Sequence, residues 1–263
     1  MSFVVAADSY DRFMGRYSSL LAPIFADFAG VAGKLTAVEV GCGPGALTGV
    51  LADRLGAEAV TAVDPSPPFV AAARERFPGV TVREAAAESL PFDDSLFDLS
   101  LAQLVVHHMS DPVAGVREMA RVTAPGGTVA ACVWDLGAGM DPLSPFWRAV
   151  KRFDSAARGE SGYAGTREGH LVEIFEAAGL DRVEGEGLVF EVEHSSFEEW
   201  WEPFKLGVGP AGAYAAGLSP EEQARLEALC REELPPPPFT LSLRAWAARG
   251  TPSTGEGRTG HTM

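Results

Sequence analysis

Short apolar runs and helical repeats of apolar positions follow one another along the first half of the chain. Residues 37–40 are apolar and β-branched apart from Glu39, which is typical of a buried strand. Apolar residues then recur at helical spacing, which predicts a helix that begins near Ala46. Further strands are predicted by the same criteria, at 60–64, 80–84, 97–103 and 128–134. The opening βαβαβ order is the half-unit of a doubly wound parallel sheet.

The pattern becomes less regular after Trp134. A glycine-rich stretch over about 136–165 and an aromatic, then helical stretch over about 196–236 are not needed to build a sheet, and we predict that they form a helical cap at the strand tips. Strands are predicted between and after them, at 188–193 and 239–246. The sequence therefore predicts one domain over 1–249, with a tail over 250–263 that has too few apolar residues to fold.

The segment before the first strand opens with aromatic and arginine residues and continues with a helical repeat of apolar positions. Residues 8–30 are therefore predicted to form a lid over the strand tips. An amphipathic helix packed on the sheet edge is the alternative.

Three glycines at alternate positions separate the first strand from the helix that follows it. Gly41, Gly43 and Gly45 allow a sharp turn and let a ligand lie against the backbone, so strand, turn and helix form a cradle of the nucleotide-binding type. A simple turn and a dinucleotide site both fit, because Gly41-x-Gly43-x-x-Ala46 matches the dinucleotide pattern. With Glu39, the turn also resembles the first motif of class I methyltransferases, an acidic residue and a spacer before Gly-x-Gly-x-Gly.

Asp64 ends the second predicted strand. A carboxylate at this position can accept hydrogen bonds from both hydroxyls of a ribose. The alternative is a helix N-cap before Pro65, which is a common role for aspartate. The glycine cradle upstream favours the ribose interpretation.

Several motifs along residues 8–135 together resemble one family. They are Glu39-Val-Gly-Cys-Gly-Pro-Gly45, Asp64, Leu90-Pro-Phe-Asp93, His107-His108 with Asp111-Pro112, and Pro125-Gly-Gly127. Their order and spacing resemble the class I S-adenosylmethionine-dependent methyltransferases of the ubiquinone/menaquinone-biosynthesis type, which methylate small molecules. The resemblance implies an α/β, Rossmann-like, doubly wound sheet of seven strands, with residues 239–248 as a last, antiparallel strand.

The resemblance also implies a set of residues that hold S-adenosylmethionine. They are Tyr10, Arg16, Glu39, Gly41, Cys42, Gly43, Asp64, Pro65, Ser66, Ala87, Glu88, Gln103 and Leu104. The glycine turn would contact the methionyl and ribose parts, Asp64 the ribose hydroxyls, and residues 65–66 and 87–88 the adenine. Gln103 and Leu104 would face the methionine end, and Arg16 would pair with its carboxylate. Ala86 departs from the family, in which many relatives have an acidic residue toward the adenine amino group; Glu88 or a backbone carbonyl would substitute.

Methyl transfer from a sulfonium is an in-line displacement that needs alignment and exclusion of water, and no metal. His107 and His108 do not form a predicted metal site, because neighbouring histidines are expected to point apart and no further ligands accompany them. The resemblance implies that they lie at the cofactor's reactive end, where one would be a general base; a structural histidine is the alternative.

Four aromatic residues fall in the two predicted insertions, and they suggest an apolar roof over a partly hydrophobic acceptor. They are Trp147, Trp200, Trp201 and Phe204. The alternative is that they only pack the inserted helices against the sheet.

Composition narrows the choice of partners. A formal net charge of −15 argues against nucleic acid or an anionic membrane as a partner. Three widely spaced cysteines are typical of reduced thiols, so a cytoplasmic protein is expected, and no apolar run reaches membrane-spanning length. A SAM-dependent methyltransferase is the function predicted. An NAD-dependent oxidoreductase and a non-catalytic protein that keeps the SAM fold are the alternatives.

Overall fold

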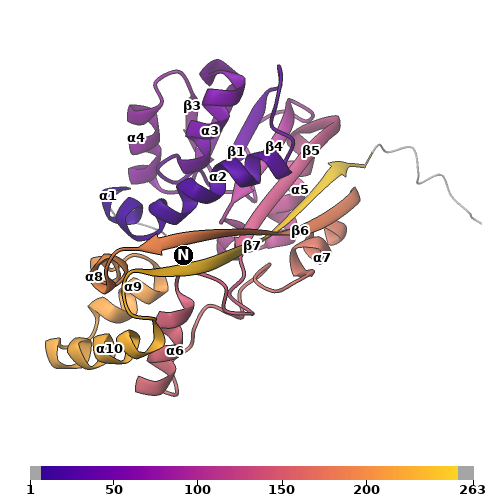
Figure 1. Cartoon of the computed structure of the whole chain (residues 1–263). Coiled ribbons are helices and arrows are strands. Elements are labelled where there is room, and N and C mark those ends of the chain that lie inside the picture. Colours follow the sequence, from indigo (N-terminus) through magenta and orange to yellow (C-terminus); the bar gives the residue numbers. More distant parts are fainter. Residues whose placement is uncertain (1–6, 254–263) are drawn as a thin grey trace, which may run out of the picture.

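Seven strands form one mixed sheet in the computed structural model, which describes residues 7–253 (Figure 1). The strands lie in the order β3-β2-β1-β4-β5-β7-β6. They are β1 (Ala37–Val40), β2 (Val60–Asp64), β3 (Thr81–Glu84), β4 (Phe97–Gln103), β5 (Thr123–Trp134), β6 (Leu180–His194) and β7 (Phe239–Pro252). Neighbours from β3 to β5 are parallel, whereas β7 is antiparallel to both β5 and β6. The predicted fold class is therefore confirmed.

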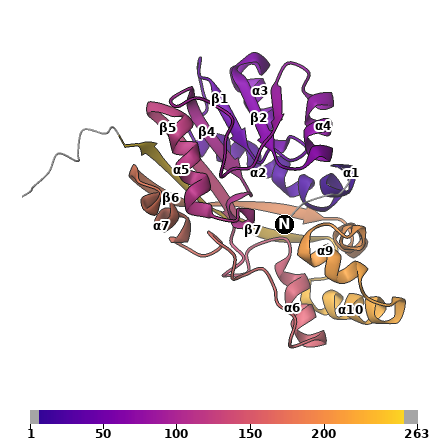
Figure 2. The same cartoon turned by 180° about the vertical axis from the view of Figure 1, so that it is seen from behind.

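Helices cover both faces of this sheet. They are α1 (Ala7–Tyr10), the π-helix η1 (Asp11–Gly15), α2 (Arg16–Phe28), α3 (Ala46–Leu55), α4 (Pro67–Arg76), α5 (Pro112–Val122) and α7 (His170–Ala177), with 3-10 turns η2 (Ala57–Ala59) and η3 (Val106–His108). Helices α2 to α4 lie on one face, and α5 and α7 lie on the face seen in Figure 2. Ala37 packs against the helices of one face and Val38 and Val40 against those of the other. Because both of its faces are covered, β1 is buried along its whole length.

Three strands are longer than the sequence pattern predicts. β5 begins at Thr123, with Pro125-Gly-Gly127 inside it where its register with β4 shifts. β6 begins at Leu180 and pairs along its length with β7, which continues to Pro252. Many β6 residues are exposed, and charged residues are frequent along the strand. The sequence of its first half therefore does not resemble that of a buried strand. The predicted tail therefore begins later than residue 250, and residues 254–263 lie outside the described part of the chain.

The two predicted insertions form helices at one end of the sheet. They are α6 (Ser144–Phe153), α8 (Phe197–Trp201), the 3-10 helix η4 (Glu202–Leu206), α9 (Gly209–Ala216) and α10 (Pro220–Glu233). This cap follows β5 and β6 and precedes β7 along the chain, so it lies at the carboxyl edge of the parallel strands (Figures 1 and 2). That edge is where open α/β sheets bind ligands.

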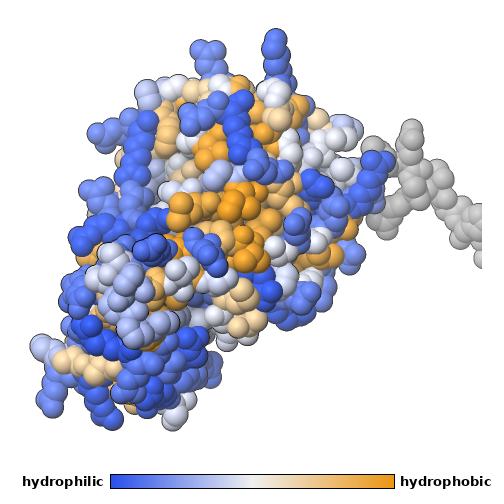
Figure 3. Space-filling model, in the orientation of Figure 1, coloured by the Kyte–Doolittle hydropathy of each residue, from blue (hydrophilic) through white to orange (hydrophobic). Residues whose placement is uncertain are grey.

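The surface is uneven in character. Figure 3 shows apolar surface near the middle of one face, over the long strands β6 and β7, whereas the outside of the cap is largely hydrophilic. None of the helices in residues 7–253 has both the length and the apolar character needed to cross a membrane.

Candidate active site

A cavity of about 480 Å³ opens at the carboxyl edge of β1, β2 and β4. A narrower space of about 30 Å³ adjoins it and shares Tyr10, the glycine turn and Gln103 with it. Ten of the residues predicted to hold a cofactor line the larger cavity: Tyr10, Gly41, Gly43, Asp64, Pro65, Ser66, Ala87, Glu88, Gln103 and Leu104. Glu39 and Cys42 line the narrower space. The structure thus brings together residues from five separate segments of the chain.

The floor of the cavity is backbone, because the turn after β1 needs glycine for two different reasons. Gly43 has φ of +54°, and a Cβ atom there would meet nothing within 4 Å, so the missing side chain leaves open space beside the cavity. Gly45 has φ of +104°, and a Cβ atom there would lie 2.3 Å from the Phe77 ring. The first glycine leaves room for a ligand and the second is required by packing.

Asp64 is locked in place by two backbone donors. The Gly43 N–H donates to Oδ2 at 2.9 Å and the Ser66 N–H donates to Oδ1 at 2.8 Å. The N-cap of α4 is Ser66, so the structure does not support the helix-cap interpretation of Asp64. Burial raises the pKa of Asp64 above its usual range, and the two N–H groups oppose that shift. Each oxygen keeps a lone pair for a further donor, as two ribose hydroxyls require.

Gln103, at the end of β4, leaves a buried acceptor at the cavity. Its Nε2 donates to the carbonyl of Ser18 at 3.1 Å, which ties β4 to α2. Its Oε1 is buried and has no hydrogen-bond partner within residues 7–253. A buried acceptor without a partner is costly, so a ligand N–H or ammonium at this point would stabilise the site. This observation fits the amino group of a methionyl ligand.

Glu39 lies deeper, behind the glycine turn. Thr48 Oγ1 donates to Glu39 Oε2 at 2.5 Å, and burial raises the pKa of Glu39 to about 8. The Glu39 carboxyl group is therefore hydrogen-bonded to a side chain of α3. The acidic position of the glycine motif is thus a buried link between the strand and the helix that flank the turn.

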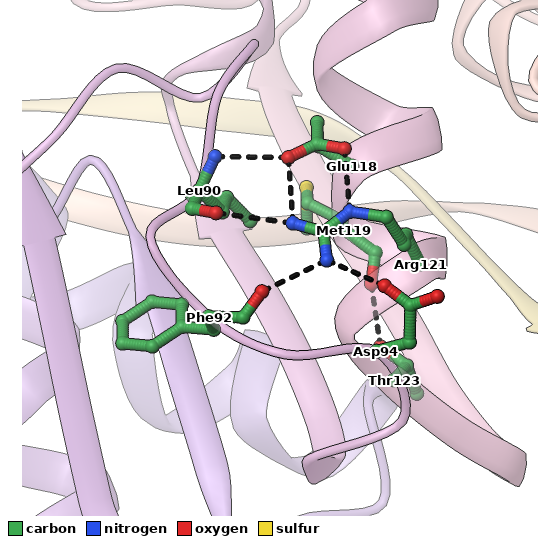
Figure 4. A network of polar contacts seen from close by, with 7 residues as sticks. All are labelled: Leu90, Phe92, Asp94, Glu118, Met119, Arg121 and Thr123. Carbon is green, nitrogen blue, oxygen red and sulfur yellow. Dashed lines mark hydrogen bonds and ion pairs between the residues drawn. The ribbon is translucent and has the colours of Figure 1, made fainter.

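Figure 4 shows how the Leu90-Pro-Phe-Asp93 motif is held beside the cavity. Arg121, on α5, donates to the carbonyls of Leu90 at 3.0 Å and Phe92 at 2.8 Å. Glu118 accepts the Leu90 N–H at 2.9 Å and also pairs with Arg121. This network fixes the loop whose preceding residues, Ala87 and Glu88, line the cavity.

The chain before β1 closes one side of the site. Tyr10, on α1, lines both spaces, and its ring meets Phe69 edge-on at 5.3 Å. Burial raises the pKa of Tyr10 to about 12, so the phenol is neutral. Leu21 and Phe25 of α2 are buried against the sheet. The segment over residues 8–30 thus combines features of both interpretations, with α1 at the cavity and α2 in the core.

Comparison with known proteins agrees with this geometry. Residues 38–131 match the family model described as "Methyltransferase domain". The matched segment contains the glycine turn, Asp64, Gln103 and the histidine pair. Residues 38–131 therefore form a methyltransferase domain.

Curated relatives resemble less than half of the chain. The rice (Oryza sativa) protein named 2-methyl-6-phytyl-1,4-hydroquinone methyltransferase 2 is 37% identical over 117 residues, which is 43% of this chain and 31% of that protein. The chain spans about a third of the length of the curated relatives it matches.

Solved structures resemble nearly the whole chain, at low identity. Phosphoethanolamine N-methyltransferase 2 of Haemonchus contortus, in complex with S-adenosyl-L-methionine, has a TM-score of 0.59 at 18% identity over 94% of this chain and 57% of that one. The [4+2]-cyclase SpnF has a TM-score of 0.56 at 22% identity over 89% of this chain and 81% of that one. These two likenesses establish the fold alone.

A second, smaller cavity of about 50 Å³ lies between the methyltransferase domain's cofactor cavity and its cap. It shares Tyr10, Leu104 and His108 with the cofactor cavity. Leu104 has φ of +61°, a strained conformation that is often found at functional sites. Because this smaller cavity lies beside the cofactor cavity, it is the candidate acceptor cavity.

The two histidines on η3 line this acceptor cavity, and their rings do not point apart as predicted. The ring centroids of His107 and His108 are 3.8 Å apart, because the 3-10 turn brings the side chains together. Burial lowers the pKa of both, to about 4 for His108, so both rings are neutral at pH 7. His107 Nδ1 is buried without a partner among the described residues. A neutral ring is able to accept a proton, so a general base stays a prediction.

The aromatic set of the cap lies behind the acceptor cavity, not on its wall. Trp200, Trp201 and Phe204 are at most 2% exposed, and neither they nor Trp147 line either cavity. Phe204 stacks on Phe146 at 4.6 Å, inside the cap. The structure therefore does not support direct contact between these residues and an acceptor, because their apolar surface is buried inside the cap.

Arg16 is also turned away from the cofactor cavity. Its guanidinium donates to the Glu199 carbonyl at 2.8 Å and to the Tyr17 hydroxyl at 2.6 Å, and it lines neither the cofactor cavity nor the narrow space beside it. The prediction that it pairs with a methionine carboxylate is therefore not supported. Arg16 instead ties the start of α2 to α8 of the cap.

Several residues at the acceptor cavity were not predicted, and two of them show why. Phe13 of η1 and Glu160, from the loop between α6 and α7, both line it. Phe13 had a signal, since it belongs to the aromatic opening of the chain. Glu160 had none, because a single acidic residue in a glycine-rich stretch does not differ from a solvent-exposed one until the fold is known.

Proposed function

We propose that this protein transfers a methyl group from S-adenosylmethionine to a small, partly hydrophobic acceptor by in-line displacement. The observation that carries the proposal is the Asp64 carboxylate, held by the N–H groups of Gly43 and Ser66 at the edge of a cavity floored by glycine. A carboxylate fixed in this way suits two vicinal hydroxyls of a ribose. The methyltransferase domain over residues 38–131 supports the choice of cofactor.

Each part of the cofactor has residues suited to it. The oxygens of Asp64 would accept from the ribose, and Pro65, Ser66, Ala87 and Glu88 would surround the adenine, where the space is lined by both polar and apolar groups. When bound, the sulfonium supplies an activated methyl group, and the protein's part is to orient the acceptor and exclude water.

The methionine end has its own residues. Gly41, Cys42 and the buried Gln103 Oε1 would hold it, with Glu39 behind them. Tyr10 and Leu104 border both cavities, so they would separate the reacting groups from solvent.

The acceptor would enter beneath the cap. The smaller cavity is lined mostly by apolar side chains, which favours a partly hydrophobic molecule. His107 or His108, which line this cavity, would serve as a base if the acceptor group has to lose a proton. A cytoplasmic location agrees with three cysteines that are all buried and unpaired.

Two alternatives remain in the proposal. One is a protein that keeps the fold without methyl transfer; the likeness to a solved [4+2]-cyclase bears on the fold alone and does not decide for it. An NAD-dependent oxidoreductase shares the glycine turn and Asp64, but nothing beyond these favours it. The buried Gln103 Oε1, which has no hydrogen-bond partner among residues 7–253, fits a ligand amino group, and this suits the methionyl cofactor.

The test is selective stabilisation of the full chain by ligands. S-Adenosylmethionine and S-adenosylhomocysteine should raise the melting temperature, because they bind the folded state only. NADH at the same concentration is the control and should leave it unchanged. Stabilisation by NADH without stabilisation by S-adenosylhomocysteine would reject the proposal. Transfer of labelled methyl to a metabolite extract would then separate an enzyme from a non-catalytic binding protein.

A further inference from the structure

The acceptor cavity has an acidic wall and no basic one. Among residues 7–253, Glu160 is the one carboxylate that lines it, and no lysine or arginine does. Most of the remaining wall is apolar, including Phe13, Trp134 and Leu143. The two histidines opposite are neutral at pH 7 because burial lowers the pKa of each. Among the described residues, the side chains that a bound molecule would contact in this cavity are therefore either neutral or negatively charged.

Glu160 is built into the structure and is not a stray surface residue. It is 5% exposed, and the indole Nε1 of Trp147 donates to its Oε2 at 2.9 Å. Its loop is fixed by its own bonds, since the Tyr163 N–H donates to the Glu160 carbonyl at 3.1 Å and Thr166 Oγ1 donates to the Tyr163 carbonyl at 2.8 Å. Within the described chain, nothing donates to the other oxygen, Oε1. One oxygen is thus held by the cap while the other is left for a ligand.

The charges around Glu160 leave its own charge uncompensated. Asp141, just before α6, adds to the negative potential, and burial with Asp141 raises the pKa of Glu160 to about 7 against the opposing bond from Trp147. Tyr163 of its own loop and His107 face the same region, their rings 6.4 Å apart. A buried carboxylate without a cation gains most from a ligand that brings one.

We propose that Glu160 binds the amino group of the methyl acceptor, so that the acceptor is an amine on a partly hydrophobic body and nitrogen receives the methyl group. This inference rests on the methyltransferase function proposed above. It concerns the cap half of the molecule, to which the family match over residues 38–131 does not extend. It also gives the Trp147 indole a role, which is to position Glu160 and not to touch the acceptor.

The charges in the reaction agree with an acidic wall. The Glu160 carboxylate takes one proton from the bound ammonium, and the freed nitrogen lone pair forms the N–C bond as the S–C bond breaks. Sulfur keeps the electron pair of the broken bond, so the positive charge passes from sulfur to nitrogen and arrives beside the acidic wall. Glu160 then gives its proton to solvent, and the methylated ammonium leaves. A carboxylate or phenolate acceptor would instead place a second negative charge against Glu160.

The experiment compares head groups on one body. The full chain, saturated with S-adenosylhomocysteine, is titrated by calorimetry at pH 7 with 2-phenylethylamine, 2-phenylethanol and phenylacetate, and with butylamine, butanol and butyrate. In at least one series the amine should bind ten times or more tighter than its matched alcohol and carboxylate. Repeating the titration in two buffers of different ionisation enthalpy should reveal proton release with the amine, because the cation favours the ionised form of Glu160.

Glu160→Gln tests the residue itself, and Glu168→Gln, on the exposed part of the same loop, is the matched control. The first should weaken amine binding tenfold or more and abolish proton release, while the affinity for S-adenosylhomocysteine stays unchanged. The second should behave as the wild type does. If Glu160→Gln fails to fold, as its melting curve would reveal, Trp147→Phe keeps the carboxylate, removes the bond that holds it, and should weaken amine binding by a smaller factor.

Three outcomes would overturn the inference: tighter binding of the alcohol or carboxylate in both series, no binding by either amine, or unchanged amine binding in a folded Glu160→Gln variant. A wild-type protein that does not bind S-adenosylhomocysteine would instead reject the proposed function itself. The two failures are therefore distinguishable.

Discussion

The two binding spaces of this protein are built in different ways. The cofactor cavity has a floor of glycine backbone, and the carboxylate at its edge, Asp64, is oriented by two backbone N–H groups. The acceptor cavity is lined by side chains from η1, η3, the α6–α7 loop and α9, and its one carboxylate, Glu160, is oriented by an indole. The first lies mostly in the segment that matches a known family, and the second lies mostly outside it.

This difference implies that the two cavities tolerate substitution to different degrees. Backbone geometry at the glycine turn tolerates almost no substitution, because positive φ and close packing both exclude side chains. A wall of side chains on separate cap elements can change residue by residue without disturbing the sheet. Backbone conformation thus determines the shape of the cofactor cavity, and side-chain packing determines that of the acceptor cavity under the cap. Substitutions in one should therefore leave the function of the other unchanged.

The largest effect is expected in the cap. Trp201→Ala removes a side chain that is 1% exposed and should lower the free energy of unfolding by about 3–5 kcal/mol, through lost burial and the cavity left behind. Thermal or urea unfolding measures this. The folded fraction should keep its normal affinity for S-adenosylmethionine; a weakened affinity would mean that the halves are not separable.

A comparable loss, in affinity instead of stability, is expected at Asp64. Asp64→Ala removes an acceptor for two ribose hydroxyls, each bond worth about 1.5–3 kcal/mol. The affinity for S-adenosylmethionine should fall by about 100-fold or more, measured by calorimetry. Asp93→Ala, at an exposed aspartate of the same half, is the control. An unchanged affinity in Asp64→Ala would exclude the ribose role.

A smaller effect is expected at Gln103. Gln103→Leu removes the Oε1 that we propose accepts from the cofactor's amino group, and the affinity should fall by about tenfold, as for one hydrogen bond to a charged group. Gln223→Leu is matched to it, since Gln223 also donates to a helix carbonyl, Ala215 O at 2.9 Å, but within the cap. Equal affinities in the two variants would argue against this role.

The smallest effect is expected at the boundary between the halves. Burial lowers the pKa of His108 from 6.5 to about 4, so between these values the unfolded state binds more protons than the folded state. Stability should therefore fall as pH falls below 6.5, with a contribution from His108 of about 1 kcal/mol at pH 5.5. His108→Gln should reduce that pH dependence, measured by urea unfolding at pH 5.5 and 7.5. An identical pH dependence in both proteins would contradict the neutral buried histidine.

The sequence was informative where backbone conformation and burial dominate. Strands β1, β2 and β4 have the predicted bounds because short runs rich in apolar residues are typical of strands covered on both faces. The start of β5 was missed because Pro125-Gly-Gly127 is usually a break, yet here it lies within the strand. At the site, the glycine turn and Asp64 were identifiable from residue type and spacing.

The acceptor side depends on tertiary contacts that residue type does not encode. Arg16 turns toward Glu199 because the cap offers it a carbonyl, which the sequence around Arg16 cannot indicate. Trp201 is in the core of the cap, and Glu160 reaches the cavity only because Trp147 holds it there. In each case a partner distant in sequence decides the direction of the side chain.

The position of β7 between β5 and β6 has a consequence for how the chain is made. β1 to β5 are contiguous in the sheet, so β1 to β4 have all of their sheet partners as soon as Trp134 has left the ribosome, whereas β5 still lacks β7 on its other side. β6 is an edge strand whose pairing is with β7, which comes more than 40 residues later, so its backbone donors stay unpaired during that interval of synthesis. Its charged alternation, with Glu184, Glu186, Glu191 and Glu193, is the kind of pattern that discourages association of an unpaired strand with other nascent chains.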